Sequence, residues 1–240
     1  MVTMLSAAFT RYLRNGRWTG VTRTDRQAVP PVPALEQDMA NTNTRPARVV
    51  VLGHSFITRV IDFIMEENIT NCNNFGVCAN VAEVTVIAEG GKRLAHVVVD
   101  DIMIHSPDLV YVELGTCDIT DPGNTGRSVG RKLYELALAL IEKGVKKVVV
   151  GEIVFRVGAG VPENMPEVND EISRCNEYLM VTLYQQDKPE LCFWRHKNVW
   201  NASVNLYSDG THFNRLGTRR LYRSIRGAIF KFVREIKPAL

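Results

Sequence analysis

The chain has 240 residues, of which 45% are hydrophobic and 23% are charged. This composition is typical of a globular protein with a sizeable core, and it excludes collagen-like, coiled-coil and wholly disordered chains. No apolar run approaches the roughly 18 residues of a membrane span, and a net charge of +3 is too small to indicate nucleic-acid binding.

Residues 1–46 predict a basic, proline-containing, disordered tail, and residues 47–240 predict one folded domain. The first segment contains four prolines and no sustained period of 2 or 3.6 residues. Its start has no basic region ahead of a short apolar patch, so it is unlike a secretion signal and we expect an intracellular, cytoplasmic protein.

The five cysteines are an odd number without zinc-site spacing, which favours free thiols.

From Arg48 onward, short apolar runs alternate with amphipathic segments. Strands are expected at 48–53, 81–88, 108–114, 145–151 and 191–194. Helices are expected at 55–68, 92–105, 127–143, 169–186 and 214–236, with a loop at 155–168. This alternation predicts a five-stranded parallel sheet with helices on both faces, a flavodoxin-like three-layer α/β/α sandwich. Functional sites in such folds lie at the carboxyl ends of the strands.

Ser55 follows the first predicted strand, in the motif GHSF at 53–56. One interpretation is an N-cap, a position that serine fills well. The other is a nucleophile, because the free N–H groups of a helix N-terminus can stabilise an oxyanion.

Three further motifs follow at later strand ends or ahead of the last helix. They are Gly90-Gly91, then GTCD at 115–118, then DGTH at 209–212. A glycine allows close backbone approach to a ligand, and an Asp three residues before a His can orient the imidazole. Each motif is weak alone, but their order is informative.

In that order, the four motifs resemble those of the SGNH (GDSL-type) hydrolases, over roughly residues 48–233. The stretches VVVLGHSF and DGTHFNRLGTRRLYRSIRGAI look most like the esterase-like domains of some LINE-type retrotransposons and related animal genes. The resemblance implies the SGNH hydrolase fold, a small ester as substrate, and neither a metal nor a cofactor.

The resemblance also implies roles for individual residues. Ser55 matches the nucleophile, His212 the general base, and Asp209 the carboxylate that orients the base. The backbone N–H groups of Ser55 and Gly91 match two oxyanion-hole donors. The third donor of the family is an asparagine side chain, and here that position is Cys117.

Cys117 is the main departure from the family, because a thiol is a weak hydrogen-bond donor. Losing one donor costs about 2.7–4 kcal/mol, or about 10²–10³-fold in kcat. Three alternatives stay open: slow but real esterase activity, a fold kept only for binding, or another donor such as Asn124. His54 replaces the family's aspartate and either hydrogen-bonds behind the site or caps the strand end. Arg93 either contacts a charged substrate group or is a surface residue.

The last predicted helix has a basic stripe. Leu221, Ile225, Ala228, Ile229 and Phe232 fall on one helical face, and Arg219, Arg220, Arg223, Arg226, Lys231 and Arg234 fall on the other. The stripe is either an ordinary solvated face or, through Arg219, Arg220, Arg223 and Arg226, a weak site for RNA or an anionic lipid surface. The latter gives the rival hypothesis, an inactive binding module with the SGNH fold.

Overall fold

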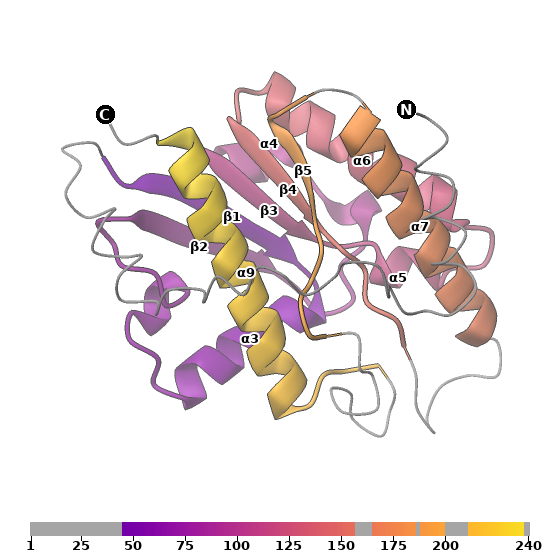
Figure 1. Cartoon of the computed structure of the whole chain (residues 1–240), viewed down its shortest axis with the longest axis horizontal. Helices are drawn as coiled ribbons and strands as arrows, with labels where there is room; N and C mark the ends of the chain where they lie inside the picture. The colour runs from indigo at the N-terminus through magenta and orange to yellow at the C-terminus, as the bar shows by residue number, and fades with distance from the viewer. Residues whose placement is uncertain (1–44, 157–164, 186–187, 200–210, 238–240) are drawn as a thin grey trace, which may run out of the picture. The chain divides into compact units, whose positions relative to one another are not determined.

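The computed structural model describes residues 45–156, 165–185, 188–199 and 211–237. Five parallel strands form one sheet in the order β2-β1-β3-β4-β5 (Figure 1). They are β1 (Ala47–Gly53), β2 (Ala82–Ala88), β3 (Leu109–Glu113), β4 (Lys147–Gly151) and β5 (Leu191–Trp194). The predicted five-stranded parallel sheet is therefore confirmed. The predicted tail lies outside the described residues except for its last two positions.

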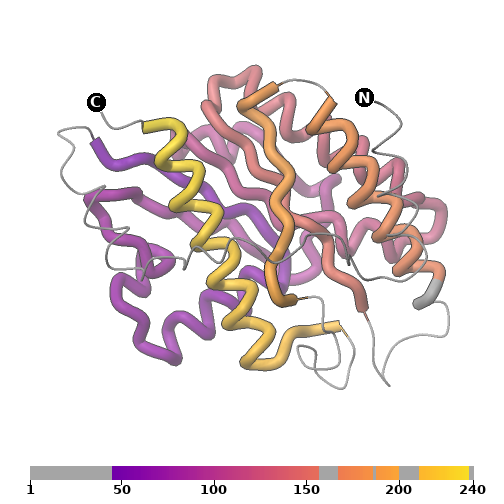
Figure 2. Tube along the Cα trace, in the orientation of Figure 1, coloured from indigo at the N-terminus to yellow at the C-terminus, as the bar shows by residue number. Residues whose placement is uncertain are grey.

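Helices cover both faces of the sheet (Figures 1 and 2). On one face lie α3 (Ser55–Glu66) and α9 (Arg215–Ile236), and on the other lie α4 (Val99–Met103), α6 (Gly126–Glu142) and α7 (Met165–Gln185). The chain is thus the three-layer α/β/α sandwich that the alternation of elements predicts.

Strand β1 shows why its sequence is an unbroken apolar run. Val49 and Val51 belong to the core under α3 and α9, whereas Val50 and Leu52 belong to the core under α4, α6 and α7. All four side chains are at most 1% exposed. Burying each one contributes about 1.5–3 kcal/mol, so both faces select apolar residues.

The register of the sheet fixes where the site-bearing loops begin. Gly53 at the end of β1 pairs with Ala88 of β2 on one side and with Glu113 of β3 on the other. The segments that follow these three residues therefore leave from the same edge of the sheet.

The prediction of one continuous helix at 92–105 is wrong. The structure has a 3₁₀ turn at Leu94–His96 and a separate short helix, α4, and the intervening Val97 and Val98 are extended. Consecutive β-branched valines disfavour helix because their χ1 rotamers are restricted. A second difference is α5 (Thr116–Ile119), a single helical turn that overlaps the GTCD motif and was not among the predicted helices.

The contact between α6 and α7 depends on a glycine. A Cβ atom on Gly126 would overlap the backbone oxygen of Glu171 and would lie 2.8 Å from the backbone nitrogen of Cys175. Gly126→Ala is therefore expected to lower the free energy of unfolding by about 1–3 kcal/mol, measured by urea denaturation. Gly227→Ala is the matched control, since nothing lies within 4 Å of its Cβ position and alanine favours the helix. Equal stability of the two variants would contradict the prediction.

Asp108 connects the start of β3 to Arg45 and Arg48 at the start of β1. Its carboxylate accepts hydrogen bonds from the Arg45 guanidinium at 2.8 and 2.9 Å and from the Arg48 N–H at 2.9 Å, and it pairs with Lys146 at 3.1 Å. Burial raises the pKa of Asp108, but these donors outweigh it and hold the pKa well below its usual range.

This depressed pKa predicts a pH-dependent stability. The ionised group stabilises the fold above the pKa of the unfolded chain, and the contribution is lost as pH falls through the folded-state value. Asp108→Asn is expected to cost about 1–3 kcal/mol at neutral pH, with a deficit that shrinks below about pH 4, measured by urea titrations across pH. Asp100→Asn, which removes the exposed pair with Lys143, should change stability little. A deficit independent of pH would refute this origin.

Candidate active site

Ser55 is the first residue of α3 and its side chain is half-buried. The N-cap of this helix is His54, whose Nδ1 accepts the Phe56 N–H at 3.5 Å. The N-cap interpretation of Ser55 is therefore wrong, because the preceding residue fills that position. The Ser55 hydroxyl consequently lies at the helix N-terminus without a capping role.

His54 lies beside the Ser55 hydroxyl, with 3.4 Å between Nδ1 and Oγ. Burial lowers the pKa of His54 to about 4, with Arg156 and His212 adding to the reduction and Glu113 opposing it. A group with this pKa is neutral at physiological pH and accepts a proton poorly there. His54 is thus a helix cap beside the nucleophile position, and not a strand cap or a competent base.

Because the His54 Nδ1 accepts a hydrogen bond, the neutral imidazole carries its proton on Nε2. That Nε2 is buried and has no hydrogen-bond partner among the described residues. The imidazole ring is 2% exposed and packs on Phe56, with 4.8 Å between ring centroids.

His212 is placed near the start of α3 by aromatic packing. The Phe56 ring contacts His212 edge to face at 6.3 Å and packs on Phe213 at 4.9 Å. Within the described residues, the imidazole in hydrogen-bonding range of the Ser55 hydroxyl is that of His54 and not that of His212. Asp209, the predicted third member, lies outside the described residues.

The loops that carry Gly91 and Cys117 are joined by two polar contacts. The Asp118 carboxylate accepts the Leu94 N–H at 3.1 and 3.3 Å, and Arg93 forms an ion pair with Asp121. Arg93 is therefore occupied by a neighbouring loop. The Asp118 carboxylate thus links the two loops, and burial raises its pKa.

The two predicted oxyanion positions on these loops differ in accessibility. Gly91 is exposed, has a φ of +73° and has nothing within 4 Å of its Cβ position. Cys117 lies half-buried in α5, and burial raises the pKa of its thiol. The thiol is therefore neutral at physiological pH and offers only a weak donor.

Asn124 does not present a free amide to the site. Its Nδ2 donates to the Asp118 carbonyl at 3.0 Å, and its Oδ1 accepts from Lys132 at 3.2 Å. Its amide therefore holds the loop after α5 together, which disfavours the alternative that Asn124 replaces the missing asparagine.

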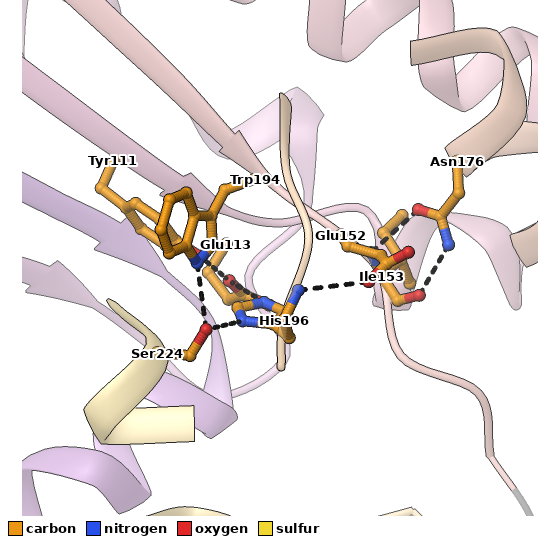
Figure 3. A network of polar contacts seen from close by, with 8 residues as sticks. All are labelled: Tyr111, Glu113, Glu152, Ile153, Asn176, Trp194, His196 and Ser224. Atoms are coloured by element: carbon orange, nitrogen blue, oxygen red, sulfur yellow. Dashed lines mark hydrogen bonds and ion pairs between the residues drawn. The ribbon is translucent and has the colours of Figure 1, made fainter. Parts of the chain in front are cut away.

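A second Ser-His-Glu arrangement lies between the sheet and α9, and sequence reasoning missed it (Figure 3). His196 Nδ1 is 3.0 Å from Ser224 Oγ, and His196 Nε2 is 3.2 Å from Glu113 Oε2. Trp194 Nε1 donates to Ser224 at 3.0 Å, and the Tyr111 hydroxyl donates to Glu113 at 2.9 Å.

This network is closed to substrate. His196 is 2% exposed, Glu113 4% and Ser224 8%. A self-consistent assignment has the Ser224 hydroxyl donating to Nδ1 and the Nε2 proton donated to Glu113. The network therefore satisfies buried polar groups. Its one sequence signal is Glu113, an acidic residue at the end of an otherwise apolar strand.

The basic stripe of α9 is partly used within the molecule. The predicted apolar face is confirmed, since Leu221, Ile225, Ala228, Ile229 and Phe232 are all at most 2% exposed. Arg226 donates to the Gly76 carbonyl at 2.9 Å, Arg220 donates to the Asn198 carbonyl at 3.2 Å, and Lys231 lies over Trp194 and Phe232. These contacts give no support to an RNA or lipid site.

Other candidate sites are few in the part of the chain that the structure describes. No group of His, Cys, Asp and Glu there has the arrangement of a metal site, and no helix there is long and apolar enough to cross a membrane. A cavity of about 400 Å³ lies between α6 and α7, beside Arg127, Arg174 and Tyr178. It contains none of the predicted site residues.

The architecture is the SGNH hydrolase fold, as solved structures show. An acetyl esterase, crystallised as a mutant with an acetate ion, is 15% identical and matches 80% of this chain and 100% of its own, with a TM-score of 0.59. A putative acylhydrolase from Bacteroides fragilis NCTC 9343 is 18% identical over 85% of this chain and 98% of its own, with a TM-score of 0.58.

A third match is a GDSL-like lipase from Bacteroides thetaiotaomicron VPI-5482, which is 15% identical over 83% of this chain and 97% of its own, with a TM-score of 0.55. No protein-family model and no curated protein sequence matches the chain. At these identities the structural matches establish the fold and leave activity to be argued from the site.

Proposed function

We propose that the protein is a serine ester hydrolase with Ser55 as nucleophile, His212 as general base and Asp209 as the carboxylate that orients it. The observation that carries the proposal is the position of Ser55. Its half-buried hydroxyl starts α3 at the carboxyl end of β1, and Phe56 packs His212 against the same helix start. Structural neighbours with this fold include acetyl esterases and a GDSL-like lipase.

The proposed reaction has two halves. Ser55 Oγ attacks the ester carbonyl carbon while His212 takes the hydroxyl proton, and the carbonyl oxygen becomes an oxyanion. Collapse of this intermediate expels the alcohol, which takes the proton from His212, and leaves an acyl-serine. Water then attacks the acyl-serine while His212 takes its proton, and collapse of the second oxyanion intermediate releases the carboxylic acid and returns that proton from His212 to Ser55 Oγ.

Proton transfer requires His212 to reach the Ser55 hydroxyl. Catalytic hydrogen bonds are often long before substrate binds and shorten in the substrate complex. The edge-to-face contact with Phe56 at 6.3 Å keeps the His212 ring close to the start of α3, the helix that begins with Ser55. His54 does not replace it, because a base with a pKa of about 4 is too weak at neutral pH.

We propose small acyl esters as the substrate class. Several structural neighbours are named acetyl esterases or acetylxylan esterases. The segments flanking the proposed site are polar or exposed, with Gly90 and Gly91 both open to solvent, so nothing in the described residues demands a long apolar acyl chain.

Covalent labelling tests the nucleophile independently of the natural substrate. A fluorophosphonate probe is expected to modify Ser55 in the wild type, identified by mass spectrometry of the labelled peptide, and to leave Ser55→Ala unmodified. Ser173→Ala is the matched control and should label normally, because its hydroxyl only donates to the Asn169 carbonyl within α7. Wild-type protein that is folded and unlabelled would reject the proposal.

A further inference from the structure

Arg156 is held firmly at the carboxyl end of the sheet, a short loop beyond the end of β4 at Gly151. The Asn169 side chain of α7 pins its backbone on both sides: Oδ1 accepts the Arg156 N–H at 2.9 Å, and Nδ2 donates to the Arg156 carbonyl at 2.6 Å. Two hydrogen bonds to one amide fix the position from which the side chain extends.

The guanidinium of Arg156 has no partner among the described residues. Its Nε is buried and forms no hydrogen bond, and no carboxylate of the described residues pairs with the group. Arginine stays protonated in proteins, so this part of the fold retains a half-buried cation without a counter-charge. Such a group destabilises the fold, which is typical of a residue kept for a ligand or a reaction.

The charge of Arg156 acts on the proposed active site. Burial raises the pKa of the Cys117 thiol, and the strongest opposing influence is Arg156, ahead of Arg93. Arg156 also contributes to the lowered pKa of His54, the neighbour of Ser55. Because β3 and β4 are adjacent parallel strands, the segment that carries Arg156 leaves the same edge of the sheet as the segment that carries Cys117.

We propose that Arg156 supplies the third oxyanion-hole donor, in place of the asparagine that Cys117 replaces. The inference rests on the proposed ester hydrolysis by Ser55. As Oγ adds to the ester carbonyl, a full negative charge develops on the carbonyl oxygen, and a guanidinium N–H donates to it. No proton is transferred to or from Arg156, and the oxyanion is the counter-charge that the described residues do not provide.

The other candidate donors of this region are already engaged. Arg93 is paired with Asp121, the Asn124 amide donates to the Asp118 carbonyl, and the Cys117 thiol is a weak donor. Arg156 alone among these four combines a strong donor with a lack of partners in the described structure.

A double-mutant cycle tests the proposal. Wild type, Arg156→Met, Cys117→Asn and the double variant are compared for kcat and KM on p-nitrophenyl acetate, whose acyl group is neutral. Arg156→Met is expected to lower kcat by about 10²-fold with little change in KM, as loss of one donor does. In the Arg156→Met background, Cys117→Asn should restore kcat by at least about ten-fold, because the asparagine amide supplies the missing donor.

A second measurement separates a catalytic role from a structural one. Arg156→Met is expected to raise Tm, because it removes an unpaired buried charge. A lowered Tm together with proportionally lost activity would show a structural role and overturn the inference. Normal kcat in Arg156→Met, or no rescue by Cys117→Asn, would also overturn it.

The remaining outcomes are equally decisive. If Arg156→Met loses activity only on the anionic ester p-nitrophenyl succinate, by a raised KM, the residue binds a substrate carboxylate and the inference is wrong. If the wild type shows neither turnover nor fluorophosphonate labelling of Ser55, the proposed ester hydrolysis is wrong. The donor role of Arg156 is then wrong as well, even if Arg156→Met raises Tm.

Discussion

Ser55→Ala is expected to reduce kcat for p-nitrophenyl acetate by about 10³–10⁶-fold while the fold is retained. Removing the nucleophile of a Ser-His-Asp unit leaves only binding and the oxyanion hole to accelerate hydrolysis. The methyl group of alanine fits the first position of α3, since the cap of that helix comes from His54. Circular dichroism and Tm should therefore match the wild type.

A double variant tests whether Ser55 and His212 act together in the reaction. Residues that act as a unit are not additive, so Ser55→Ala combined with His212→Ala should be no slower than Ser55→Ala alone. Ser173→Ala, on the opposite layer, should retain wild-type kcat. A Ser55→Ala variant with full activity would remove Ser55 from the reaction. Additive losses would remove His212 as its base.

His196→Leu is expected to lower the free energy of unfolding by about 3 kcal/mol or more. The change leaves the buried carboxyl group of Glu113 with Tyr111 as its remaining partner in the described structure, and it removes the hydrogen-bond acceptor of Ser224. Buried polar groups that lose a partner cost about 1–3 kcal/mol each, and more when charged. Urea denaturation gives the difference directly.

Ser224→Ala is the matched variant for that network. It removes one hydroxyl and leaves the His196 contact with Glu113 intact, so a smaller loss of about 1–2 kcal/mol is expected. Both variants, in conditions where they are folded, should still label at Ser55 with fluorophosphonate. Labelling lost in Ser224→Ala but kept in Ser55→Ala would instead make the buried arrangement the reactive one.

The fold could be predicted because each strand is an apolar run that can be recognised in the sequence by itself. An apolar run such as 48–53 is explained by burial on both faces, and this pattern is visible without any coordinates. The helix at 92–105 was predicted wrongly, because apolar spacing alone does not detect that Val97 and Val98 favour extended backbone.

The site could be predicted only where residue type and position coincide. Ser55, Gly91 and Cys117 follow strand ends, and their roles were inferred from the resemblance to the SGNH hydrolases and stay predictions. Arg156 could not be found this way, since an arginine in a loop is ordinarily solvated, and its lack of partners among the described residues becomes visible only in three dimensions. The roles of His54 and Arg93 likewise depended on contacts with segments remote in sequence.

The hydrogen bond from the Leu94 N–H to Asp118 and the ion pair of Arg93 with Asp121 join the loops after β2 and β3. For protein engineering, this makes the two loops a single mutational unit. Libraries that diversify one loop should retain solubility if they keep the residues that form these two contacts. Replacing either loop alone with that of another hydrolase would remove one partner of each contact.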